Sequence, residues 1–89
     1  TLDSFATSAY RLAKYVIIAE NAAGDEWETA EVMLVHDGST ATITTYGVIA
    51  TGTDSWTYTA DIDTGNVRLR VTGPEASTTV KFQPTYIRV

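Results

Sequence analysis

Residues 27–46 read WETAEVMLVHDGSTATITTY, and this stretch decides the fold. Apolar and polar residues alternate on both sides of its centre, which is the two-residue period of a half-buried strand. At the centre stands Asp37-Gly38, in which both residues tolerate positive φ; such a pair is the strongest short signal for a hairpin turn. The stretch therefore predicts two antiparallel strands over residues 27–36 and 40–50.

Two details of this hairpin carry further expectations. Val32-Met33-Leu34-Val35 is continuously apolar, which is typical of a strand end that is buried on both faces or nearly so. In the second strand Gly47 interrupts the alternation and predicts a β-bulge.

The alternation continues outward from the hairpin, and no stretch supports a convincing helix. Trp56 and Tyr58 share one face of a later strand with Ala60 and Ile62, and we expect that face to be core. Pro84 must lie at an edge, a bulge or a break, because proline cannot donate to a strand ladder. Further strands are predicted, each bounded by turn residues, over residues 11–20, 55–62, 67–72 and 78–89.

The composition agrees with strands. The chain has 89 residues, is 44% hydrophobic and contains sixteen threonines, whose β-branched side chains suit a pleated surface. Thr42, Thr44, Thr57 and Thr59 fall on the polar side of their strands. The chain has no cysteine, so its stability must come from packing.

These observations predict an all-β protein: an antiparallel β-sandwich or flattened barrel of about six to eight strands. Residues 1–89 form a single domain, since splitting so short a chain would leave two cores too small to fold. Residues 1–7 are expected to be an extended amino-terminal arm, able to pair with a neighbouring copy or to continue into a preceding domain.

Charge and hydropathy exclude two classes of partner. Six Lys/Arg against eleven Asp/Glu, a net charge of −5, make binding to a phosphate backbone unfavourable, so no nucleic acid is expected. The longest mainly apolar run, residues 15–19, is far too short to cross a bilayer, and no signal peptide is expected at the amino terminus.

Catalysis is not expected either. His36 is the only histidine, so catalytic triads and histidine metal clusters lack their usual centre. No Gly-x-Ser-x-Gly elbow or phosphate-cradling glycine loop is present. We therefore predict no catalytic residue and no cofactor.

Two acidic groups suggest calcium, and each has a structural reading that we favour. An ion could bind the carboxylate oxygens of Asp25, Glu26, Glu28 and Glu31. A solvated strand edge, whose charges prevent aggregation with other chains, explains these residues as well. Asp61 begins an acid-x-acid-x-Gly pattern. However, the twelfth position of a calcium loop needs glutamate, and Thr72 stands there, so a hairpin turn is expected and no metal site.

Aromatic residues offer a different kind of site. An exposed Trp or Tyr platform on a sandwich indicates sugar binding, but Trp56 and Tyr58 are expected in the core. Trp27, beside the acidic turn, is the expected exception.

Four segments resemble, in the same order, a small domain common in the virion proteins of tailed phages, notably those of T4-like marine cyanophages. The most distinctive parts are VHDG at 35–38 and GNVRL at 65–69. The resemblance covers nearly the whole chain, over residues 4–15, 29–40, 44–47 and 60–72.

The resemblance implies a non-enzymatic structural module of a virion, produced in the host bacterial cytoplasm. Its expected partners are other virion proteins or copies of itself, as a homo-oligomer. The alternative is a carbohydrate-binding module for host-surface glycans, which would use Trp27 or Trp56 with nearby acids and a bound calcium.

Overall fold

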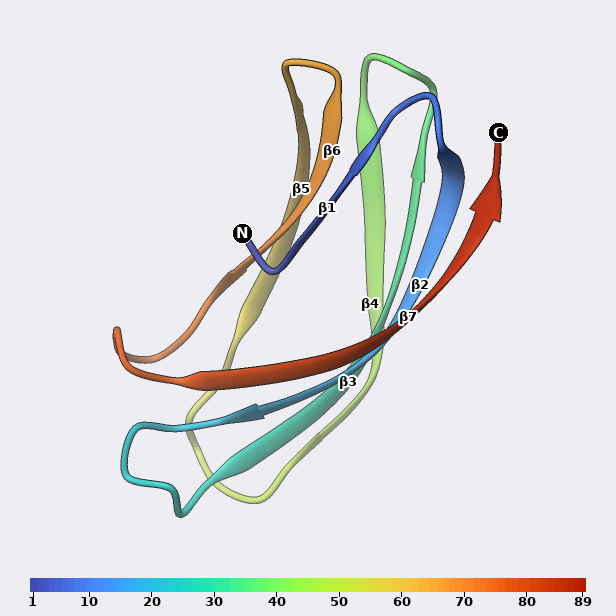
Figure 1. The fold of residues 1–89 in the computed structure, drawn as a ribbon. Coiled ribbons are helices and arrows are strands. Elements are labelled where there is room, and N and C mark those ends of the chain that lie inside the picture. Colours follow the sequence, from blue (N-terminus) through green and yellow to red (C-terminus); the bar gives the residue numbers. More distant parts are fainter.

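The computed structural model describes residues 1–89, and Figure 1 shows them as strands without any helix. No helix is therefore present that could cross a membrane. The predicted all-β class is confirmed. The strands are β1 (Asp3–Ala6), β2 (Tyr10–Glu20), β3 (Trp27–His36), β4 (Ala41–Ala50), β5 (Thr57–Asp63), β6 (Asn66–Thr72) and β7 (Thr79–Arg88).

The seven strands form two antiparallel sheets packed as a sandwich. One sheet has the order β1-β6-β5 and the other the order β4-β3-β2-β7. The turns of the β3–β4 and β5–β6 hairpins lie at the same end of the molecule (Figure 1). Four strands are edges of a sheet: β1 and β5 in the smaller sheet, β4 and β7 in the larger.

The register between β2 and β3 sorts the side chains into two sets. Tyr15 lies opposite Val32 and Ile17 opposite Ala30, and all four are buried against the smaller sheet. Because successive residues of a strand point to opposite faces, their neighbours in sequence point outward. The core so formed consists of Phe5, Ala13, Tyr15, Ile17, Ala19, Ala30, Val32, Leu34, Trp56, Tyr58, Val67 and Leu69.

The run Val32-Met33-Leu34-Val35 follows the same alternation, so the expectation that it is buried on both faces is wrong. Val32 and Leu34 are buried, whereas Met33 and Val35 are 40% and 48% exposed. No element covers the outer side of this sheet, and an apolar sequence cannot reveal which of its two faces is covered.

The β3–β4 hairpin is present as predicted, but its turn is longer than a two-residue loop. Residues 37–40 connect the strands, and only Gly38 among them has positive φ, 98°. The Asp37 carboxylate accepts hydrogen bonds from the backbone N–H groups of Ser39 and Thr40 at 3.0 and 2.8 Å. These bonds hold the pKa of Asp37 below its usual range, and the bond from Ser39 has the largest effect.

The β5–β6 hairpin has the tight turn that the sequence predicted over residues 63–66. Its central residues are Thr64 and Gly65, with φ of 51° and 78°, and Asp63 pairs with Asn66. Positive φ at both central residues is the geometry that matches the twist of the flanking strands.

The predicted features of the edge strands are confirmed. The register of β3 with β4 shifts between Thr29 and Glu31, where Gly47 has a φ of 63°, so the bulge exists. Pro84 lies in β7, an edge strand, opposite Tyr15.

The amino-terminal segment departs from the expectation. It is extended, but Asp3–Ala6 pair with β6 of the same chain instead of reaching outward as an arm, and Phe5 is part of the core. Burial of one phenylalanine stabilises the fold by about 1.5–3 kcal/mol, which favours docking over a free arm.

Asp3 joins the two sheets along one side of the sandwich. Its Oδ2 accepts hydrogen bonds from the hydroxyls of Tyr15 at 2.8 Å and Tyr86 at 2.7 Å, from β2 and β7. Tyr86 also stacks on Tyr10 with ring centroids 4.5 Å apart, and Phe5 packs edge-on against both rings. β1 is thus fixed to the larger sheet by one carboxylate and one aromatic cluster.

We expect Asp3→Ala to lower the free energy of unfolding by roughly 2 kcal/mol, because it leaves two tyrosine hydroxyls without their acceptor. Ser4→Ala, on the exposed face of the same strand, serves as the control and should change it by less than about 0.5 kcal/mol. Urea denaturation of both variants measures the difference, and equal effects would contradict the role given to Asp3.

Stability should fall at alkaline pH. Burial raises the pKa of Tyr58 to about 12, and the nearby Glu28 carboxylate adds to this effect. Burial is also the main cause that raises the pKa of Tyr15 and of Tyr86, and the hydrogen bond of each hydroxyl to Asp3 is the second. The unfolded chain releases these protons near pH 10, so the stabilisation is complete below that pH and is lost above it. Denaturation at a series of pH values, with tyrosinate absorbance followed in parallel, should show this loss; stability that stays constant to pH 11 would contradict it.

Candidate functional site

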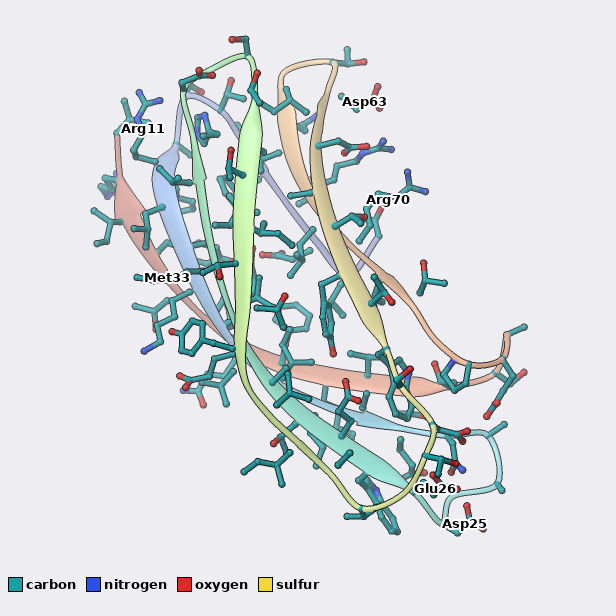
Figure 2. All side chains as sticks on the ribbon, turned by 180° about the vertical axis from the view of Figure 1, so that it is seen from behind. Arg11, Asp25, Glu26, Met33, Asp63 and Arg70 are labelled. Atoms are coloured by element: carbon teal, nitrogen blue, oxygen red, sulfur yellow. The ribbon has the colours of Figure 1, made fainter.

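The outward-pointing residues of the four-stranded sheet form a broad surface, here called the outer face. It is defined by the strand registers and by burial that alternates along each strand. Met33 points away from the sandwich on this side, whereas Arg70 lies on the opposite side (Figure 2). The outer face comprises Leu12, Lys14, Val16, Ile18, Glu20, Trp27, Thr29, Glu31, Met33, Val35, Thr42, Thr44, Tyr46, Ile49, Thr79, Lys81, Gln83, Thr85 and Ile87.

The outer face is rich in exposed apolar side chains. Val16, Ile49 and Ile87 are 54%, 71% and 58% exposed, and Ile18, Met33 and Val35 exceed one third. Exposed apolar side chains gathered on one uncovered face of a sheet indicate a site of interaction.

The charges on the outer face cancel. Lys14 and Lys81 oppose Glu20 and Glu31, so the face is neutral although the chain carries −5. The Lys14 ammonium lies 3.4 Å from the Glu31 carboxylate near the centre. This contact with Glu31 raises the pKa of Lys14, and the nearby Tyr46 hydroxyl adds to the effect.

A shallow apolar hollow marks one end of the outer face. It has a volume of about 260 Å³ and is lined mainly by Leu12, Met33, Val35 and Ile43. A polar hollow of about 110 Å³ lies at the other end, bounded by Trp27, Glu20 and Lys81 among others. Trp27 is 37% exposed, as predicted, and its Nε1 donates a hydrogen bond to Glu20 Oε2 at 2.9 Å.

The outward side of the smaller sheet has a different character. Thr57 and Thr59 are exposed there, as predicted, beside Arg68 and Arg70. Arg68 donates two hydrogen bonds to the Asp61 carboxylate, at 2.8 and 2.7 Å. These bonds are the main reason why the pKa of Asp61 lies below its usual range. This side offers ion pairs and hydroxyls, without an apolar patch.

The first predicted acidic group does not stay together. Asp25 and Glu26 lie in the turn after β2 (Figure 2), Glu31 points to the outer face, and Glu28 points inward. Glu28 is only 5% exposed, so its reading as part of a solvated strand edge is wrong. Glu28 is one of the alternate residues of β3 that point inward, and its charge gives no sign of this position.

The turn acids have structural hydrogen-bond partners. Asn21 is buried, and its side-chain amide donates to Asp25 Oδ1 at 2.8 Å and to Asp54 Oδ2 at 3.0 Å. Glu26 Oε1 accepts a hydrogen bond from the Asp54 N–H at 3.0 Å. These bonds join the β2–β3 turn to the loop between β4 and β5.

The second acidic group forms the ion pairs of the β5–β6 hairpin. Arg68 contacts both Asp61 and Asp63, and Arg70 lies 3.7 Å from Asp61. No three His, Asp or Glu side chains of the chain are grouped so that they could hold a metal ion. This group therefore belongs to a hairpin, as the spacing indicated.

His36 and Trp56 are both interior. His36 is buried, with Nε2 2.6 Å from the Tyr10 carbonyl oxygen and Nδ1 accepting the Gly38 N–H at 3.0 Å. Trp56 is 6% exposed, as expected for core, and so offers no platform to a sugar.

The sequence contained a signal for the outer face that was interpreted differently. A strand with consecutive apolar residues, such as Val16-Ile17-Ile18, is apolar on both faces. Only the arrangement of the two sheets shows that the outward members of this run, Val16 and Ile18, stay uncovered, beside Glu31 and Thr29 of β3.

No protein-family model matches the chain, and no curated protein matches it in a sequence comparison. The outer face is therefore interpreted from its own residues.

A matched pair of substitutions in β3 separates surface from core. Val32→Thr should lower the free energy of unfolding by roughly 2 kcal/mol, since it places a hydroxyl in the core. Val35→Thr, at an exposed position three residues away, should cost less than about 0.5 kcal/mol. Urea denaturation compares them, and a large loss in Val35→Thr would show that the apolar outer face serves folding instead of binding.

Proposed function

We propose that this chain is a non-enzymatic structural module of a phage virion, which assembles with other virion proteins or with copies of itself through the outer face. The observation that carries the proposal is the exposed, neutral, apolar surface of the four-stranded sheet. Exposed valine, isoleucine and methionine side chains lose unfavourable contact with water when another protein covers them.

The size of the outer face supports this role. Four strands about 4.8 Å apart with five rows of side chains span roughly 650 Å², near the ~800 Å² that each partner contributes to a standard interface. The neutral charge also suits close contact, because no net charge has to be desolvated or matched. A face of this kind fits the side of another β-domain.

The proposed role is non-enzymatic because the polar residues that could act in catalysis already have structural partners. Both ring nitrogens of His36 have backbone partners, and the Asp61 carboxylate is paired with Arg68. The Asp3 carboxylate accepts from two tyrosines. These groups have structural partners that a catalytic group would have to exchange for a substrate.

The assignment to a virion rests on the resemblance of residues 4–15, 29–40, 44–47 and 60–72 to a domain of tailed-phage virion proteins. The resemblance also supports a homo-oligomer and production in the host bacterial cytoplasm.

The carbohydrate-binding alternative keeps one observation in its favour, the exposed ring of Trp27 beside Glu20 and Lys81. The hollow there, about 110 Å³, lies below the ~300–1,000 Å³ of ordinary ligand pockets. Binding to a glycan array that disappears in Trp27→Ala, with unchanged thermal unfolding, would support this alternative over the proposal.

The proposal predicts that Val16→Lys weakens self-association at least tenfold, because it leaves an extra cation in the middle of the contact. Chromatography with light scattering over a range of protein concentrations measures the mass. Thr59→Lys adds the same charge to the outward side of the other sheet and should behave like the unmodified chain. Identical masses for Val16→Lys and the unmodified chain at every concentration would contradict the proposed role of the outer face in self-assembly.

A further inference from the structure

The edge strand β4 differs from the other three edges of the sandwich. Ala41–Ala50 reads ATITTYGVIA and contains no charged residue and no proline. Seven of its ten residues are exposed. It is rich in Thr, Ile, Val and Tyr, which favour strands. The free backbone groups along such an edge are a ready template for another strand.

The other edges carry the features that natural proteins use to prevent pairing. β7 contains Lys81, Pro84 and Arg88, and β5 contains Asp61 and Asp63. The four-residue β1 is short and begins with the carboxylate of Asp3. β4 has no charge, no proline and is not short, and its one protective feature, the bulge at Gly47, leaves residues 41–46 regular.

From this contrast we propose that two copies of the chain pair through β4, antiparallel, to form a continuous eight-stranded sheet. The occupant of the edge is a second copy, because the uncharged, threonine-rich strand can pair with itself. Two chains of −5 each repel, and β4 is the one edge at which they can meet without bringing like charges together.

The side chains of β4 are compatible with pairing to themselves. A twofold axis perpendicular to the sheet keeps outer residues beside outer residues, so Thr42, Thr44 and Tyr46 meet the same set from the other copy. Cross-strand threonine and aromatic pairs stabilise antiparallel strands. The inner residues Ile43 and Thr45 meet in the same way.

The bulge at Gly47 limits the paired segment. Gly47 shifts the register between β3 and β4, so the regular part of the edge is residues 41–46. Six residues are enough for a strand of ordinary length. Pairing here also joins two outer faces side by side and doubles the apolar surface available to the particle.

The inference goes beyond the proposed function, because it concerns the sheet edge and not the outer face. The test therefore starts from Val16→Lys, in which association through the outer face is impaired. Thr45→Lys is added to place a charge on the inner side of the β4 edge at an exposed residue. Thr59→Lys, at an exposed threonine on the edge strand β5 of the other sheet, is the matched control.

Light scattering should give twice the chain mass for Val16→Lys and for Val16→Lys/Thr59→Lys, and the single chain mass for Val16→Lys/Thr45→Lys. A monomeric Val16→Lys variant, or a Val16→Lys/Thr45→Lys variant that stays dimeric, would overturn edge pairing. Neither result affects the outer-face proposal, which depends on the loss of larger species in Val16→Lys.

Hydrogen exchange provides a second measurement that needs no change in β4. In the Val16→Lys protein, exchange of backbone amides over residues 41–46 should slow as concentration rises, whereas exchange in β7 should stay constant. If exchange over 41–46 is the same in dilute and concentrated samples, edge pairing is refuted, whether or not the Thr45→Lys variant folds.

Discussion

The pairing register of β2 with β3 is the constraint on which this structure depends. A slip of one residue would send Val16 and Ile18 into the core and Tyr15 and Ile17 into solvent. The Tyr15 hydroxyl would then be unable to meet the Asp3 carboxylate, so β1 would lose its tie to the larger sheet. One register therefore determines the core, the closure of the sandwich and the residues presented on the outer face.

The strands could be predicted from sequence because alternation and turn residues are local signals. The strand Trp27–His36 and the turn at residues 63–66 were located from such signals, and so was the bulge at Gly47. β1 was missed as part of a sheet, since four residues give too little pattern and its partner β6 is about 60 residues away. Long-range pairing of this kind leaves no mark on local sequence.

The candidate site was harder to predict for a related reason. Met33 and Val35 are as apolar as Val32 and Leu34, and only the arrangement of the two sheets decides which pair is covered. Glu28 was misleading in the opposite sense, because this polar residue lies on the inner face of β3 and is buried there. Hydropathy reports the character of a face, and topology decides what the face contacts.

The central claim, that the apolar outer face is a contact surface, can be tested by methyl-resolved NMR of the unmodified chain from dilute to concentrated solution. The account predicts that signals of Val16, Ile18 and Val35 shift or broaden with concentration, while the core residues Val67 and Leu69 stay unchanged. Methyl signals on the outer face that do not respond, or changes confined to the three-stranded sheet, would contradict it.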